Sequence, residues 1–218
     1  MSVFRKVVRY TLRDLLRSRW LAGYTLVLAL ATDALFRFSA TPEKAGLSLV
    51  SVVLFVVPVV SLVVGAMVVY AAREFTELLL AQPIPRRSLF LAQYVGMAVP
   101  LSLAYAVGLS IPFVIHGVAV SELTMLTVLV GAGVALTWIF TAIAHLLPTR
   151  CDDRVKGLAA AIGIWISLTM LYDGLVLAMA ATFHEYPIDR PMLPLLPANP
   201  VDLARLSLLL QFDTPGLR

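Results

Sequence analysis

Charged side chains are rare in this chain, so the places where they gather are the first candidates for chemistry. The segment 70–94 reads YAAREFTELLLAQPIPRRSLFLAQY and separates two stretches that are almost free of charge. It holds five charged residues within fifteen positions: Arg73, Glu74, Glu77, Arg86 and Arg87. Guanidinium and carboxylate groups form strong hydrogen bonds and ion pairs with one another. The segment is therefore either the hydrated turn between two membrane helices or a docking surface.

The motifs of hydrolytic enzymes are missing from the sequence. The stretch HEYPI at His184 lacks the second histidine of a zinc-protease helix, and there is no Gly-rich phosphate loop. No serine lies in a Gly-x-Ser-x-Gly turn. The one cysteine, Cys151, offers neither an internal disulfide nor a metal cluster. We therefore expect a non-enzymatic chain that binds no cofactor and no metal of its own.

Two aspartates lie in stretches that are otherwise apolar, where an ionised group needs a partner. Asp33 precedes Arg37 by four residues, a spacing that favours an ion pair along one helix face. Asp173 follows Tyr172 in LTMLYDGLVLA, and two roles stay open for these two residues. They either join two helices through a hydrogen bond or line a translocation path.

The composition predicts the elements that carry these residues. The chain has 218 residues, of which 60% are hydrophobic and 14% charged, whereas about a quarter of the residues of a soluble domain are charged. We expect an all-α, polytopic transmembrane helical bundle that forms one domain over 1–218. Five stretches are long and apolar enough to cross the hydrocarbon layer: 20–37, 48–71, 89–115, 122–147 and 156–182. In the last two, Gly131, Gly133, Gly157 and Gly163 are candidate sites for close helix approach.

Residues 3–20 form an amphipathic pattern at the N-terminus. Apolar residues recur every three or four positions, and Arg5, Arg9, Arg13 and Arg17 recur on the other side. Such a helix lies among the lipid headgroups of an anionic leaflet. Two roles stay open for it: it either fixes topology only or also contacts other parts of the protein.

The basic residues are sorted by loop, which membrane topology explains better than nucleic-acid binding. The N-terminus and the loops 72–88 and 148–156 together hold twelve Lys and Arg residues, and the other side holds five. The positive-inside rule places the first set in the cytoplasm. We therefore expect a bacterial inner-membrane protein with a cytoplasmic N-terminus.

The segment 73–82 is longer and more amphipathic than a simple turn requires. Phe75, Leu78 and Leu79 form an apolar stripe, Glu74 and Glu77 occupy another face, and Pro-Ile-Pro follows. The pattern predicts a discrete cytoplasmic helix with a face to bury. The alternative is a helix that lies on its own membrane surface.

The segment 183–218 departs from the pattern of the spans. Five prolines between Pro187 and Pro200 prevent a regular helix there. Asn199 and Pro200 then open a short helical pattern that cannot cross a membrane. We expect an interfacial or re-entrant piece on the outer face.

The segment 73–86 resembles the coupling-helix loop of ABC-2 type ABC transporter permeases. The matching residues are Arg73, Glu74, Thr76, Leu79, Leu80, Pro83, Ile84 and Arg86. The resemblance implies that two permease copies pair and that each docks on a cytoplasmic ATPase subunit, which holds the ATP and Mg²⁺. It implies docking through Arg73, Glu74, Phe75, Thr76, Glu77, Leu78 and Leu79. Phe75 stands where the family usually has Gly, and Gln93 where a basic residue is common.

A narrower resemblance points to the permeases of the system that matures the copper–sulfur site of periplasmic nitrous-oxide reductase. It is carried by two short motifs: Tyr172-Asp173, and then Asn199, Pro200, Asp202 and Arg205. It implies export of a sulfur species and a periplasmic accessory protein that docks on the second motif. Six spans are usual in the family, so the sequence given either stops before a sixth span or represents a five-span variant. The alternative function is a non-transporting membrane scaffold that recruits soluble partners.

Overall fold

The computed structural model describes residues 3–39, 42–82, 85–116, 120–175, 178 and 199–213, and in these ranges every regular element is helical. The predicted all-α class is thereby confirmed. The α-helices are α1 (Val3–Leu16), α2 (Arg19–Phe38), α3 (Pro42–Ala71), α4 (Arg73–Leu80), α5 (Arg86–Ile115), α6 (Val120–Leu146), α7 (Arg154–Ile166) and α10 (Pro200–Asp213). A 3₁₀ turn, η1 (Leu147–Thr149), follows α6, and a π-helical turn, η2 (Ser167–Leu171), extends α7.

Five helices are long and apolar enough to cross a membrane, as the sequence predicts. They cover Arg19–Phe38, Lys44–Ala71, Arg86–Ile115, Leu123–Thr149 and Arg154–Leu175. The expected fifth span continues to residue 182, but beyond 175 only Ala178 belongs to the described residues. The predicted outer segment 183–218 is described only over 199–213.

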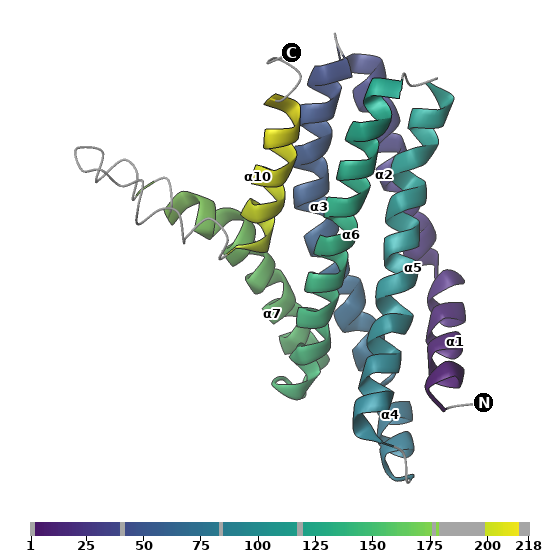
Figure 1. Ribbon diagram of the computed structural model, residues 1–218. Coiled ribbons are helices and arrows are strands. Elements are labelled where there is room, and N and C mark those ends of the chain that lie inside the picture. The colour runs from purple at the N-terminus through teal and green to yellow at the C-terminus, as the bar shows by residue number, and fades with distance from the viewer. Residues whose placement is uncertain are drawn as a thin grey trace.

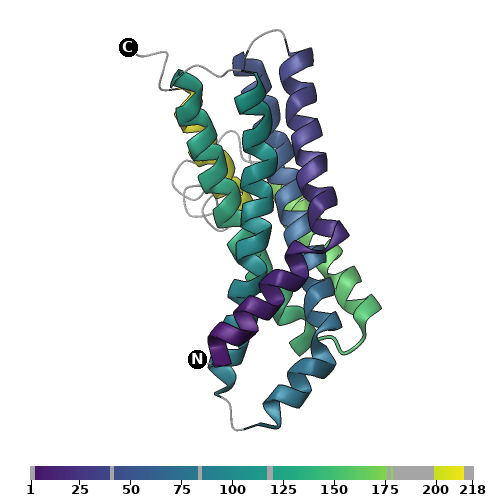
Figure 2. The ribbon, with the colours of Figure 1, turned by 90° about the vertical axis from the view of Figure 1, so that its right-hand side faces the viewer.

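α2, α3, α5 and α6 stand nearly upright in one bundle, and α7 runs obliquely beside it (Figure 1). α3 packs against α6 and α7, and α5 packs against α1, α2 and α6. The N-terminal helix, α4 and the α6–α7 turn lie toward the lower end in Figures 1 and 2. These are the three basic segments that charge counting assigns to one side of the membrane.

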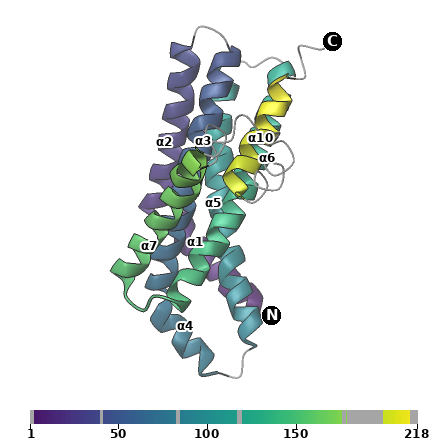
Figure 3. The same cartoon turned by 90° about the vertical axis from the view of Figure 1, so that its left-hand side faces the viewer.

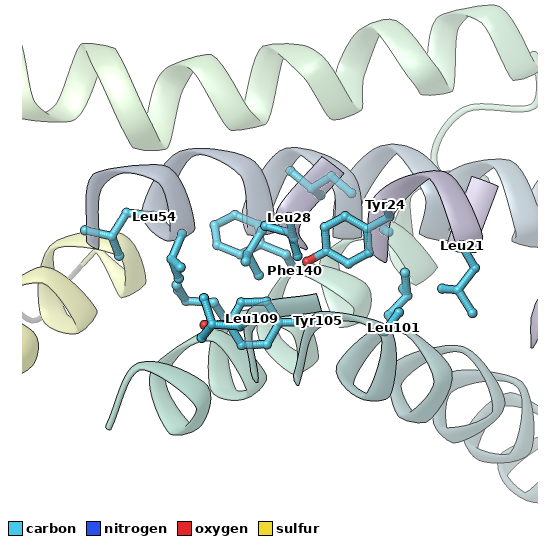
Figure 4. Close-up of a cluster of buried hydrophobic side chains, with 14 of the residues drawn as sticks. Leu21, Tyr24, Leu28, Leu54, Leu101, Tyr105, Leu109 and Phe140 are labelled. Atoms are coloured by element: carbon cyan, nitrogen blue, oxygen red, sulfur yellow. The ribbon is translucent and has the colours of Figure 1, made fainter. Parts of the chain in front are cut away.

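The centre of the bundle is filled by large apolar and aromatic side chains (Figure 4). Tyr105, Leu28, Leu109 and Phe140 are fully buried. The Tyr105 hydroxyl donates a hydrogen bond of 2.7 Å to the Leu129 carbonyl oxygen, so this polar group is satisfied inside the bundle. In lipid, such close packing rather than exclusion of water holds helices together.

Small residues set the closest helix contacts. A Cβ at Gly108 would lie 2.8 Å from the Thr25 carbonyl oxygen of α2. At Gly133 it would meet the Tyr105 ring, and at Gly157 the Tyr70 ring. Two of the four glycines proposed from the sequence thus serve close approach. No other part of the described chain approaches the remaining two, because a Cβ at Gly131 or Gly163 would meet nothing within 4 Å.

Helix α1 runs obliquely across the bundle and packs on α5 (Figure 2). It buries Val7 and Leu15, and its Thr11 lies against Gly96, where a Cβ would approach the Thr11 Cβ to 2.8 Å. Its basic side chains are exposed, namely Arg5, Lys6, Arg9, Arg13 and Arg17. One face of the amphipathic helix therefore contacts the bundle, beyond any part that it plays in topology.

Helix α10 lies beside α6 and also contacts α3 (Figure 3). It begins about halfway along the bundle and runs toward the end opposite α4 (Figure 1). Val201 and Leu208 are buried in the same apolar core as the long helices. This short helix is therefore part of the bundle, not a piece resting on its end.

Candidate functional site

Helix α4 projects from the lower end of the bundle (Figure 3). Only Ala72 separates it from α3, and its eight residues end at Leu80. The Thr76 hydroxyl donates 2.8 Å to the Ala72 carbonyl oxygen, and Glu74 lies in the first turn, where a carboxylate complements the helix dipole. The predicted cytoplasmic-loop helix is thus a discrete element with its own start and end.

Arg73 fixes α4 to the turn between α6 and α7. Its Nη1 donates 2.9 Å to the Asp152 carbonyl oxygen, and its Nη2 donates 2.9 Å to Asp152 Oδ1. Its Nε donates 3.1 Å to Glu77 Oε1 on the next turn of α4. The hydrogen bonds to Asp152, and then to Glu77, raise the pKa of the Arg73 guanidinium. Beside it, the Tyr70 hydroxyl donates 2.6 Å to the Cys151 carbonyl oxygen.

The two departures from the family pattern have partners within the chain. The Phe75 ring lies 5.5 Å from the Tyr10 ring of α1, centroid to centroid, with 32° between the planes. Gln93 of α5 is buried, and its Nε2 donates 2.6 Å to the Thr76 hydroxyl. The resembled pattern usually has Gly where this chain has Phe75, which makes the ring contact, and a basic residue where it has Gln93, which makes the hydrogen bond. Both attach α4 to its neighbours.

The predicted docking residues therefore divide into two groups. Arg73 and Thr76 bind other parts of the chain, and Leu79 packs with Leu80 against Val7, Leu89 and Ala92 of α1 and α5. Three residues point outward: Glu74 is exposed, Leu78 is 69% exposed, and the Glu77 side chain is 63% exposed. Phe75 lies between the groups, since it is 42% exposed beside Tyr10.

Sequence reasoning missed the internal partners of α4. Asp152 is 79 positions from Arg73, and Gln93 is 17 positions from Thr76. Helix periodicity reports only neighbours three or four residues apart, so it could not pair them. The available signal for Asp152 was its place in the segment 148–156, one of the basic segments that the sequence assigns to the same side of the membrane as Arg73.

A second group of polar side chains joins α10 to η2 and to the helical residues that follow η2. Arg205 Nη1 lies 2.7 Å from Asp173 Oδ2 and 3.5 Å from Asp202 Oδ1. Asn199 Nδ2 donates to Asp202 Oδ2 at 3.0 Å and to the Leu168 carbonyl oxygen at 2.6 Å. Leu168 belongs to the π-helical turn η2, a helix defect that is frequent at functional sites. Asn199 Oδ1 also accepts 3.0 Å from the Val201 amide, which caps the start of α10.

The sequence predicts an outer-face contact at Asn199, Pro200, Asp202 and Arg205, and burial contradicts this prediction for Asn199 and Asp202. Asn199 is fully buried and Asp202 is 6% exposed, so neither side chain reaches the surface of the described chain. Pro200 opens α10 and is half-buried, as are Arg205 and Tyr172. The helix–helix role proposed for Asp173 is present as the ion pair with Arg205.

Asp33 has the predicted local partner and one distant partner. Its Oδ2 lies 2.8 Å from Arg37 Nε, and its Oδ1 lies 2.8 Å from Nε2 of His116, which follows α5. The His116 ring also stacks on Phe36 at 5.5 Å between centroids. This group ties α2 to α5 at the end of the bundle opposite α4. Among the described residues, no set of three His, Cys, Asp or Glu side chains could hold a metal ion.

Comparison with known proteins places this geometry in a class. No family model matches the chain. It is 29% identical to the probable ABC transporter permease protein NosY of Stutzerimonas stutzeri, in an alignment that covers 99% of this chain and 84% of the relative. It is 28% identical to the protein of the same name from Pseudomonas aeruginosa, over 98% of this chain and 84% of the relative.

The matches cover α4, the five spans and α10 together. They support a membrane permease subunit of an ABC transporter, which is the class that the resemblance at 73–86 implies. Within that class the chain is similar to the permeases of the NosY type, in agreement with the narrower resemblance. The same matches indicate a transport subunit of a multi-pass membrane system.

Proposed function

We propose that this chain is the permease subunit of an ATP-driven exporter and that α4 is its docking element for a cytoplasmic ATPase subunit. One observation carries the proposal. α4 is attached through one face and its first residue, while Glu74, Glu77 and Leu78 stay exposed at the end of the bundle. An exposed apolar side chain beside two carboxylates suits a partner groove with an apolar floor and a basic rim.

The attachments of α4 explain how docking would move the spans. Arg73 is hydrogen-bonded to the α6–α7 turn, Phe75 contacts α1, and Thr76 is hydrogen-bonded to α5. Ala72 joins α4 directly to α3. A displacement of α4 would therefore act on several helices at once. Coupling between sites needs such a connected set of rigid elements. In this scheme ATP and Mg²⁺ are bound by the partner, and a second copy of the permease completes the path.

The orientation follows from the charge distribution. The twelve Lys and Arg residues counted on one side belong to segments that gather at the end of the bundle bearing α4. The positive-inside rule then favours a cytoplasmic N-terminus in a bacterial inner membrane, where the ATPase is available.

The cargo that we propose is a sulfur species, exported for assembly of the copper–sulfur site of periplasmic nitrous-oxide reductase. Support comes from the motif residues of the narrower resemblance. Tyr172 and Asp173 follow η2 within the candidate span Arg154–Leu175, and Asp173 is paired with Arg205 of α10. A periplasmic accessory protein would then meet the end of the chain opposite α4. Addition of a labelled sulfur donor to sealed vesicles that contain the complex would test the cargo directly.

Copurification with the ATPase subunit tests the docking proposal. Leu78→Asp introduces a charge at the exposed centre of α4 and should lower ATPase recovery at least roughly tenfold, the effect of losing an interface hot spot. Val155→Asp is the matched control, because Val155 is 73% exposed near the same end of the bundle but lies on α7. It should leave recovery unchanged. Full recovery with Leu78→Asp would overturn the assignment of α4.

The same complex separates a transporter from a scaffold. A transport subunit should change the ATP turnover of its partner, and the change should be lost with Leu78→Asp. Stable binding with turnover that is indifferent to the permease would instead indicate a scaffold that only recruits the ATPase.

A further inference from the structure

An open groove lies between the start of α5 and the end of α6, apart from the docking face of α4. Its volume is about 490 Å³. Two cationic residues and several apolar or aromatic residues line it: Arg86, Arg87, Phe90, Leu91, Tyr94, Ala142 and His145. None of these residues has a role in the docking proposed above, and the two arginines need an explanation.

The charged end of the groove has a single sign. Arg86 and Arg87 are both exposed, and neither forms an ion pair within the part of the chain that the structure describes. No acidic side chain lines the groove among the described residues. Arg86 and Arg87 are the first two residues of α5, a helix apolar enough to cross the membrane. They therefore lie where the headgroup layer meets the hydrocarbon. Two neighbouring guanidiniums there attract a phosphate, with which arginine forms paired hydrogen bonds.

The remainder of the groove is an apolar wall. Phe90 is 39% exposed and Leu91 is 56% exposed. The hydroxyl of Tyr94 is already used, because it donates 3.0 Å to the Trp138 carbonyl oxygen. His145 meets the Phe90 ring edge-on, with 5.8 Å between centroids. The wall therefore offers its ring and aliphatic surfaces, which match a hydrocarbon chain.

We propose that this groove binds one anionic phospholipid. The phosphate lies between Arg86 and Arg87, and an acyl chain runs along Phe90, Leu91 and Tyr94. The chemistry selects this ligand class on two counts: the cationic end lacks a counter-charge in the described chain, and the apolar wall continues from it toward the bilayer interior. A zwitterionic lipid fits the wall equally well but brings a positive group toward the two arginines.

Quenching of tryptophan fluorescence by brominated lipid tests the site. The Trp138 ring lies 5.5 Å from the Tyr94 ring, so it reports on the groove. The chain has three tryptophans, and Trp20→Phe with Trp165→Phe leaves Trp138 alone. The full chain is reconstituted in phosphatidylcholine vesicles that contain a minor fraction of brominated phosphatidylglycerol or brominated phosphatidylcholine. We expect phosphatidylglycerol to be preferred roughly tenfold.

Two variants and one control assign the preference to the groove. Arg86→Gln with Arg87→Gln should abolish the preference for the anionic lipid. Arg150→Gln with Lys156→Gln removes the same charge from exposed positions near the same end of the bundle, outside the groove, and should preserve it. Ala142→Phe fills the groove without a change of charge and should reduce quenching by both lipids. It also decides the matter if the double arginine variant does not fold.

Three results would overturn the proposal. Equal quenching by the two lipids, as expected if a second copy of the chain covers the groove, excludes selective binding. A preference that survives Arg86→Gln with Arg87→Gln excludes the arginines. If the preference for phosphatidylglycerol falls as much in the control variant as in the Arg86→Gln, Arg87→Gln variant, it reflects the general surface charge and not binding in the groove. The measurement involves no ATPase, so its outcome is independent of the docking proposed for α4.

Discussion

At the scale of single residues, the side chains of α4 perform two separate tasks. Arg73 forms hydrogen bonds with Asp152 and Glu77, and Thr76 forms one with Gln93. The large apolar side chain of Leu78, by contrast, is mostly exposed in the described chain. This short amphipathic helix thus combines residues that anchor it to the bundle with exposed residues, to which we assign the proposed contact with a partner.

Close packing at one glycine gives a prediction at this scale. Gly108→Ala places a methyl group 2.8 Å from the Thr25 carbonyl oxygen, a backbone atom that cannot move without shifting α2. We expect a loss of about 1–3 kcal/mol in the free energy of unfolding, as for other overpacked sites. The measurement is reversible unfolding of the purified chain in mixed micelles.

The control for this substitution is Gly131→Ala on α6. A Cβ there meets nothing within 4 Å, and alanine is a better helix former than glycine. This variant should be as stable as the parent chain or slightly more stable. Equal stability of the two alanine variants would contradict the close approach of α2 and α5.

At the scale of elements, α10 shows how polar side chains attach a helix to the side of the bundle. Its start is capped by Asn199, whose side chain also binds the Leu168 carbonyl oxygen in the π-helical turn. Its middle is paired through Arg205 with Asp173. Polar groups within the hydrocarbon layer need partners because lipid offers none. The Asn199 side chain therefore satisfies a carbonyl oxygen of the π-helical turn and caps α10 at the same time.

Removal of the cap should loosen α10. Asn199→Ala leaves the Val201 amide and the Leu168 carbonyl oxygen without that partner, at a cost of about 1–3 kcal/mol. Hydrogen exchange of the backbone amides in 201–209 should accelerate. Ser207→Ala on the exposed side of the same helix is the control and should change exchange little. Unchanged protection in Asn199→Ala would contradict the arrangement of α7 and α10.

The sequence predicts the local features of these elements and not their distant partners. The five spans, α4 and the Asp33–Arg37 pair follow from apolar runs and from spacings of four residues. The contacts of Arg73 with Asp152 and of Asn199 with Leu168 join residues 79 and 31 positions apart. Such pairs depend on how the helices cross, which side-chain periodicity does not report.

The same limit explains the corrected site residues. The motif of Asn199, Pro200, Asp202 and Arg205 is polar and opens a helical pattern too short to cross the membrane. The sequence therefore predicts that these residues lie at the surface. The structure instead buries Asn199 and Asp202, because the helix enters the bundle beside α6. Burial of a polar motif is a property of the tertiary arrangement, and only the arrangement reveals it.

At the scale of the whole molecule, the two ends of the bundle differ in charge and in the side chains that they carry. One end carries α4, the α6–α7 turn and most of the basic residues, and the other carries the Asp33–His116 group and the end of α10. The likeness to ABC transporter permeases of the NosY type covers nearly all of the chain. In the function that we propose, α4 receives the motion of a cytoplasmic ATPase and the bundle responds to it.

Site-specific photocrosslinking tests this central claim most directly. A photoreactive amino acid replaces Leu78 in the full chain, which is produced together with the ATPase subunit in membranes. The account predicts a crosslink to the ATPase from position 78 and none from the equally exposed position 155. A product from position 155 alone, or none from position 78 while the two subunits still copurify, would contradict it.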